Sequence, residues 1–98
     1  MRHARFITAA RQEFLAEVAY YNEIQTGLGS SFTTAVEDAT ARALAFPLAG
    51  SPSFSNTRRV VLKGFPFSIF YRSESNGIVI FAVSHQARRP AYWVNRIT

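Results

Sequence analysis

The side chains best suited to chemistry gather near the end of the chain, where an apolar stretch runs into a basic and aromatic one. This cluster consists of His85, Arg88, Arg89, Tyr92, Trp93 and Arg96. An imidazole exchanges protons near neutral pH, and the forked guanidinium group of arginine holds phosphate or carboxylate oxygens in pairs. Tyrosine and tryptophan rings add surfaces for stacking. The cluster therefore predicts an anionic partner.

Charge is divided unevenly between the two halves of the chain. Residues 1–49 hold four arginines against five acids, a net charge of −1, whereas residues 50–98 hold seven basic residues against Glu74 alone, a net charge of +6. Together they give the +5 of the whole chain. A nucleic acid or an acidic protein segment is the expected partner, with a plainly solvated basic surface as the alternative. The expected contact residues are Arg58, Arg59, Lys63, Arg72, Arg88, Arg89, Trp93 and Arg96.

Composition excludes several classes of site. The 98 residues contain no cysteine, which removes disulfides, thiolate catalysis and cysteine-ligated zinc. The two histidines, His3 and His85, lie at opposite ends of the chain, so we expect no metal ion and no other cofactor. No apolar run approaches the roughly twenty residues that span a bilayer, and no secretory segment follows the first residues. We therefore expect one cytoplasmic domain, residues 1–98, that does not contact a membrane.

The first half of the chain has the pattern of a strand and two helices. We expect a strand at 4–7, a helix at 9–24 capped by Thr8, and a second helix capped by Ser30 or Ser31 and ended by Pro47. The expected buried stripes are Ala10, Phe14, Val18 and Tyr21, widened by Leu15, and then Phe32, Val36, Ala39, Ala43 and Phe46. The short glycine-containing connection predicts an antiparallel helical hairpin.

The second half of the chain predicts a sheet. Residues 47–57, rich in Pro, Gly, Ser and Asn, are expected to form a surface connection. Strands are expected at 58–63, 66–72 and 78–85, with turns at 64–66 and 76–77 and a short helical turn at 92–97. In the last strand Val79, Phe81, Val83 and His85 alternate with Ile78, Ile80, Ala82 and Ser84, so a central strand with two apolar faces is expected.

The predicted fold is therefore α+β, in the order strand, helix, helix, strand, strand, strand. The helical hairpin packs on one face of a small, mostly antiparallel, four-stranded sheet.

Several polar and aromatic residues also have a purely structural interpretation. His85, at a strand end, is more often a hydrogen-bonding residue than a catalyst. Trp93 is expected to cover an edge of the core, and Tyr21 to pack inside it. The acids Glu13, Glu17, Glu37 and Asp38 are expected on solvated helix faces, where no pair of carboxylates is placed for acid–base chemistry.

Five segments give the chain a resemblance to a known family. They are Ala19-Tyr20-Tyr21-Asn22, the second helix from Phe32 to Pro47, Arg58-Arg59, Phe65-Pro66-Phe67-Ser68-Ile69-Phe70-Tyr71, and His85-Gln86-Ala87-Arg88-Arg89-Pro90. In this order and spacing the chain resembles the RelE/ParE superfamily of bacterial toxins from type II toxin–antitoxin modules. The resemblance implies a toxin held inactive by a ParD-like antitoxin, acidic or partly disordered, that is encoded beside it.

Two activities occur in that superfamily. ParE-like members, of the plasmid-stabilisation type, have a histidine followed by an arginine after the last strand, as His85 and Arg88 stand here, and inhibit DNA gyrase without chemistry of their own. RelE-like members cut messenger RNA on the ribosome, using basic residues on the sheet and a carboxy-terminal tyrosine. This chain departs from the RelE pattern near Ser68, where a basic residue is expected.

We therefore expect a ParE-like toxin that causes growth arrest by binding gyrase. The first alternative is a metal-independent endoribonuclease with His85, Arg88 and Tyr92 at its catalytic site. Such an enzyme needs a base for the 2′-hydroxyl, a cation on the phosphoryl oxygens and an acid for the leaving 5′-oxygen. The second alternative is an inactive member of the superfamily that still binds its antitoxin.

Overall fold

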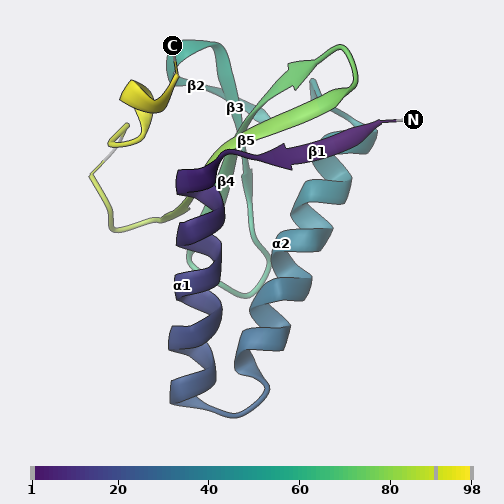
Figure 1. Ribbon diagram of the computed structural model, residues 1–98. Coiled ribbons are helices and arrows are strands. Elements are labelled where there is room, and N and C mark those ends of the chain that lie inside the picture. Colours follow the sequence, from purple (N-terminus) through teal and green to yellow (C-terminus); the bar gives the residue numbers. More distant parts are fainter. Residues whose placement is uncertain (1, 90, 98) are drawn as a thin grey trace.

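The computed structural model describes residues 2–89 and 91–97 and shows one mixed β-sheet with two helices on one face (Figure 1). In chain order the elements are β1 (His3–Phe6), α1 (Thr8–Ile24), α2 (Leu28–Ala45), β2 (Ser51–Ser53), β3 (Thr57–Val61), β4 (Phe67–Glu74) and β5 (Gly77–His85). Short 3₁₀ turns lie at Phe54–Asn56 and Val94–Arg96. The predicted α+β class is confirmed.

The sheet has five strands, in the order β1-β5-β4-β3-β2, where four were predicted. The additional strand is β2, which lies inside the stretch 47–57 that was expected to be a surface connection. Pro52 can take part because β2 is an edge strand, where its missing N–H need not join the ladder. β1 runs parallel to β5 and the other neighbours are antiparallel, so the mostly antiparallel sheet is confirmed.

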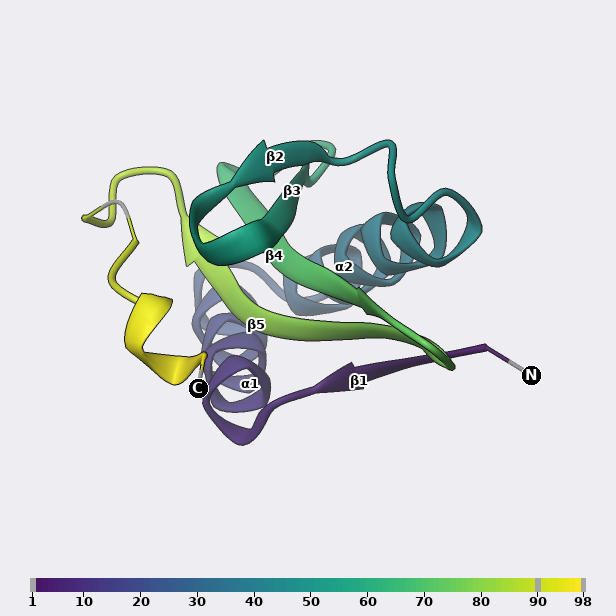
Figure 2. The ribbon, with the colours of Figure 1, turned by 90° about the horizontal axis from the view of Figure 1, so that it is seen from above.

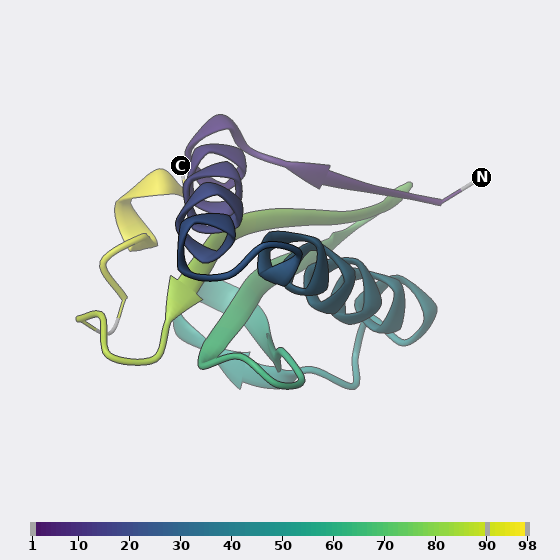
Figure 3. The ribbon, with the colours of Figure 1, turned by 90° about the horizontal axis from the view of Figure 1, so that it is seen from below.

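α1 and α2 form the predicted antiparallel hairpin on one face of the sheet (Figures 1 and 3). The residues of the α2 stripe that are buried are Phe32, Val36, Ala39 and Ala43. Two predicted core positions are wrong, because Leu15 is half exposed and Phe46 is 68% exposed. α2 ends at Ala45 and Phe46 leaves the helix with a φ of −135°, so its ring does not continue the stripe.

Both helices begin earlier than predicted. Thr8 is the first residue of α1, and Ile7 takes the cap position in an extended conformation without any side-chain cap. α2 begins directly after Gly27, whose φ of +90° is a conformation that glycine adopts freely. Neither Ser30 nor Ser31 caps the helix, because both already lie inside it. The backbone turn, rather than a capping hydroxyl, therefore sets the start of α2.

The β4–β5 hairpin shows why its glycine is needed. Glu74 pairs with Gly77, so the two-residue loop is 75–76, one residue earlier than predicted. Gly77 has a φ of +144°, and a Cβ atom there would lie 1.8 Å from the carbonyl oxygen of His3. Any side chain at Gly77 would push β1 away from β5. The predicted turn at 64–66, between β3 and β4, is confirmed.

A β-bulge redirects the second half of β5. Phe70 pairs with Ala82 whereas Tyr71 pairs with Ile80, which leaves Phe81 as an extra residue. The β5 side chains in the core under the helices are Ile78, Ile80 and Val83, and those in the cluster on the opposite face are Val79, Phe81 and Ala82. The predicted strict alternation is therefore wrong beyond the bulge. The strand is nevertheless buried along almost all of its length, as predicted for a central strand.

The C-terminal segment folds back alongside β5 and the start of α1 (Figure 2). It contains the predicted short helical turn, Val94–Arg96. The Trp93 side chain is 1% exposed, and its ring lies 4.6 Å from the ring of Phe70, centroid to centroid. This segment therefore covers the outer face of the sheet, the face opposite the helices. Neither helix of the described residues is long and apolar enough to cross a bilayer.

Candidate functional site

Four of the predicted site residues line a small hollow on the outer face of the sheet. This outer hollow has a volume of about 110 Å³ and is lined by Arg59, Ser68, Phe70, Ser84, His85, Gln86, Arg88, Ala91 and Trp93. The strand register explains the grouping, because Arg59 lies opposite Phe70 and Ser68 lies opposite Ser84. Directly paired residues share one face of a sheet. Arg88 reaches the same place from the segment after β5.

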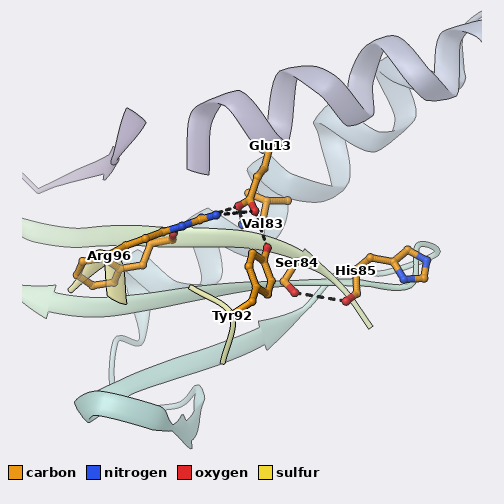
Figure 4. A network of polar contacts seen from close by, with 7 residues as sticks. Glu13, Val83, Ser84, His85, Tyr92 and Arg96 are labelled. Atoms are coloured by element: carbon orange, nitrogen blue, oxygen red, sulfur yellow. Dashed lines mark hydrogen bonds and ion pairs between the residues drawn. The ribbon is translucent and has the colours of Figure 1, made fainter. Parts of the chain in front are cut away.

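Tyr92 does not line the outer hollow. Its hydroxyl donates a hydrogen bond to Oε2 of Glu13 at 2.5 Å, as Figure 4 shows. The guanidinium carbon of Arg88 lies 4.0 Å from the centroid of the Tyr92 ring, close enough for a cation–π interaction. Of the three candidate catalytic residues, the structure therefore brings His85 and Arg88 to the hollow and holds the hydroxyl of Tyr92 elsewhere.

Glu13 is the centre of a hydrogen-bonding network that the sequence did not reveal (Figure 4). Its carboxylate accepts two hydrogen bonds from Arg96, at 2.9 and 3.0 Å, and one from the backbone N–H of Val83 at 3.1 Å, besides the one from Tyr92. Arg96 also donates to the carbonyl oxygen of Phe81 at 3.0 Å. The prediction that Glu13 lies on a solvated helix face is wrong, because its side chain is only 17% exposed.

The position of this network follows from the length of β1. β1 pairs with β5 only as far as Ile80, so the backbone groups of β5 beyond that residue lack a neighbouring strand on this side. The Glu13 carboxylate and the Arg96 guanidinium satisfy two of these groups, the N–H of Val83 and the C=O of Phe81. The network therefore closes an open sheet edge and ties the C-terminal segment to α1.

The network also shifts two pKa values. Burial, and then the hydrogen bond to Glu13, raise the pKa of the Tyr92 hydroxyl above its usual value of 10.0. The hydrogen bond to Glu13 is also the main cause that raises the pKa of Arg96. Both shifts favour the protonated forms that donate to the carboxylate.

His85 makes structural contacts of the kind expected for a strand end. Its Nδ1 accepts a hydrogen bond from the N–H of Ala87 at 2.9 Å, which shapes the turn that follows β5. Its ring meets that of Phe67 edge to face, with centroids 5.0 Å apart. His85 is among the residues that line the outer hollow, but its ring packs against Phe67 of the core under the helices, and one of its ring nitrogens is already used by the protein.

The remaining predicted contact residues fall into two groups: arginines whose side chains already interact with the protein, and cationic residues whose side chains make no hydrogen bond or ion pair within the described part of the chain. Arg58 donates to the carbonyl oxygen of Gly50 at 2.8 Å, and Arg72 donates to that of Asn56 at 3.3 Å and lies over the ring of Phe81 at 5.5 Å. The predicted contact cations without a side-chain hydrogen bond or ion pair among the described residues are Arg59, Lys63, Arg88 and Arg89. Trp93 was also expected to contact a partner, but in this structure its buried ring supports the floor of the hollow.

No group of three or more His, Asp or Glu side chains within residues 2–89 and 91–97 is placed to hold a metal ion.

Comparison with known proteins identifies relatives of this chain. The family model described as "ParE toxin of type II toxin-antitoxin system, parDE" matches residues 5–90. Among solved structures, the fold is similar to one described as "Chromosomal ParDE TA system from P. aeruginosa", with a TM-score of 0.73 and 16% sequence identity. That match covers 87% of this chain and 96% of the other. At this identity the likeness shows the fold alone. Comparison with curated protein sequences gives no match.

Proposed function

This chain belongs to the ParE toxin family of type II toxin–antitoxin systems, and we propose that it arrests bacterial growth by binding DNA gyrase until a cognate antitoxin neutralises it. In this proposal the toxin performs no chemistry of its own. Gyrase inhibition is what the resemblance to ParE-like toxins implies, and the position of Tyr92 is the observation in the structure that favours it.

A phenol that takes part in cleavage must reach the reacting phosphate, whereas the hydroxyl of Tyr92 donates to Glu13. Glu13 is in turn held by Arg96, whose side chain is also largely buried. Releasing Tyr92 toward the outer hollow would break a short hydrogen bond to a charged acceptor, which is worth about 1.5–3 kcal/mol. This arrangement supports a toxin that presents a fixed surface to a protein target.

The antitoxin is proposed to bind along the end of α2 and the neighbouring strands. A groove of about 390 Å³ lies there, lined by Arg42, Ala43, Phe46, Ala49, Gly50, Ser51, Arg59, Val60 and Val61. Phe46 and the nearby Leu48 are mostly exposed, and Val61 is partly so. Apolar side chains beside arginines suit an acidic, amphipathic segment that folds as it binds. The partner would then bury these rings and neutralise Arg42 and Arg59.

The antitoxin proposal is tested by co-purification from cells that also express the small acidic or bipartite protein encoded next to this gene. Replacing Phe46 and Leu48 with serine should weaken the complex at least tenfold and leave thermal unfolding of the free toxin unchanged, because both side chains are exposed. A complex of undiminished affinity would show that the groove is not the binding surface. The absence of any complex with the neighbouring protein would contradict the partner itself.

Cleavage of messenger RNA is the second candidate, because Arg59, His85 and Arg88 line the same hollow. In that reaction His85 would transfer a proton and the two arginines would hold the phosphoryl oxygens. The two candidates differ in their dependence on the imidazole. Gyrase binding should survive the His85→Ala change, whereas cleavage should not.

The distinguishing experiment is pulse labelling of DNA and protein synthesis after the toxin alone is induced in bacteria. We expect DNA synthesis to fall first, both in the wild type and in His85→Ala. An early loss of protein synthesis that requires His85, with folding and antitoxin binding preserved, would contradict gyrase binding and favour RNA cleavage. Unaffected growth would indicate an inactive member of the family.

A further inference from the structure

The outer hollow contains two arginines and no acid. Arg59 comes from β3 and Arg88 from the segment after β5, so they approach the hollow from either side of β4. Within residues 2–89 and 91–97 neither guanidinium donates a hydrogen bond or joins an ion pair, and Arg88 is held by its stacking on the ring of Tyr92. Two exposed guanidinium groups at one hollow, neither paired with an acid among the described residues, form a site for an anion.

A hydroxyl on β4, the strand between β3 and β5, also lines the outer hollow. Ser68, on β4, is only 3% exposed, yet it lines the outer hollow. Its side chain makes no hydrogen bond to another described residue, whereas the Ser84 hydroxyl opposite donates to the backbone oxygen of His85 at 3.3 Å. No buried side-chain N or O atom of the described residues lacks a hydrogen-bond partner, so the Ser68 hydroxyl, which has none, is open to solvent at the hollow and can bind a ligand. Ser68 can therefore donate a third hydrogen bond to the same anion.

The number and placement of these donors favour a phosphate group over a carboxylate. Donors from β3, β4 and the segment after β5 surround one small volume of about 110 Å³. A phosphate group offers three oxygen atoms that can each accept from a different direction, while a carboxylate offers two in one plane. The guanidinium groups of Arg59 and Arg88 also match the larger charge of phosphate.

A second hollow adjoins the first one. Its volume is about 500 Å³ and it is lined by Ser51, Pro52, Ser53, Phe54, Arg59 and Phe70. Arg59 and Phe70 line both hollows, and the half-exposed ring of Phe54 offers a face on which a nucleobase can stack. We propose that the outer face of the sheet binds a nucleotide, with its phosphate at Arg59, Ser68 and Arg88 and its base against Phe54. This inference does not depend on the toxin's target, because the phosphate is bound and no bond is cut.

Isothermal titration calorimetry of the purified chain tests this site, with inorganic phosphate, adenosine monophosphate and a single-stranded hexanucleotide as probes. We expect the mononucleotide to bind more tightly than inorganic phosphate, because its base also contacts Phe54. A hexanucleotide that binds more tightly still would assign the site to a nucleic acid strand, and equal affinity would assign it to free nucleotides. Either result supports the phosphate site.

Matched variants separate the site from general attraction between charges. Arg59→Ala and Arg88→Ala should each weaken binding of the mononucleotide about tenfold, whereas Lys63→Ala, which removes the same charge outside the outer hollow, should not. Ser68→Ala is the sharpest variant, because it removes a hydroxyl without a protein partner and leaves the net charge unchanged. It should weaken binding severalfold while thermal unfolding stays as in the wild type.

The proposal is overturned if Lys63→Ala weakens binding as much as Arg59→Ala, since the attraction would then be unspecific. It is also overturned if Ser68→Ala binds normally, if none of the probes binds, or if glutarate, a dicarboxylate, binds as tightly as inorganic phosphate. The last result would assign the hollow to an acidic protein segment. Because binding is measured on the isolated chain, failure here leaves the proposed action on gyrase untouched.

Discussion

Replacing Glu13 with glutamine should destabilise the toxin far more than an ordinary change on a helix surface. The carboxylate accepts four hydrogen bonds, two from Arg96 and one each from Tyr92 and the backbone of Val83. A glutamine of the same shape has one oxygen atom and presents an NH₂ group to the remaining donors. At least one N–H of Arg96 would then face another donor, and the guanidinium would lose its counter-ion.

The magnitude follows from the burial of the pair. The side chains of Arg96 and Glu13 are 21% and 17% exposed, so water screens them only in part. Breaking a buried pair costs about 3–5 kcal/mol, and hydrogen bonds to charged groups are worth about 1.5–3 kcal/mol each. With some screening, we expect a loss of about 3 kcal/mol in the free energy of unfolding. For a domain of this size that lowers Tm by about 12–24 °C.

Thermal and urea unfolding followed by circular dichroism measure the effect. Glu17→Gln is the matched control, because Glu17 lies one turn further along α1 and makes no side-chain hydrogen bond to another described residue. A double-mutant cycle with Arg96→Met should give a coupling energy above about 1.5 kcal/mol. If Glu13→Gln lost no more stability than Glu17→Gln, the network would not hold the C-terminal segment and our reasoning would be refuted.

Three further predictions follow from individual contacts. Gly77→Ala should cost about 2–4 kcal/mol in the free energy of unfolding, because a Cβ atom would collide with the carbonyl oxygen of His3, and an unchanged Tm would contradict this. The raised pKa of Tyr92 means that the unfolded chain releases this proton first, so the free energy of unfolding should fall above about pH 10, and less steeply in Tyr92→Phe. Equal slopes in the two proteins would refute that contribution. Trp93→Ala should cost about 3–5 kcal/mol, whereas Phe54→Ala should change stability by less than about 0.5 kcal/mol, and similar losses in urea unfolding would contradict the burial of Trp93.

The sequence predicts the helices and the long strands because each carries a clear apolar period. The α2 stripe from Phe32 to Ala43 repeats at helical spacing, and β5 is apolar over nearly its whole length. Strand β2 carries no such signal, because Ser51–Ser53 is too short to show an apolar period and pairs only at the edge of the sheet. Its position depends on pairing with β3, and no pattern within residues 51–53 predicts that pairing.

The bulge in β5 is likewise invisible in the sequence. Both faces of this strand are apolar, so the change of phase at Phe81 and Ala82 leaves the hydrophobic pattern intact. The bulge nevertheless decides which residues share a face with Ser84. The outer hollow could therefore be expected from the basic residues near His85, but its lining could not.

Glu13 is the residue near the site whose structural role the sequence did not predict. Its partners Val83, Tyr92 and Arg96 lie 70, 79 and 83 residues away in the chain, so no local spacing connects them. The one available signal was its position next to Phe14, at the border of the partly buried apolar stripe of α1. An acid at such a border is well placed to accept hydrogen bonds from a segment that packs against the helix.

The most direct test of the proposed action is a supercoiling assay with purified DNA gyrase, relaxed plasmid and the purified toxin. We predict that the wild type and His85→Ala inhibit supercoiling at similar concentrations, and that addition of the antitoxin restores it. Normal supercoiling at a toxin concentration well above that of gyrase would contradict the proposal that this chain acts by binding gyrase.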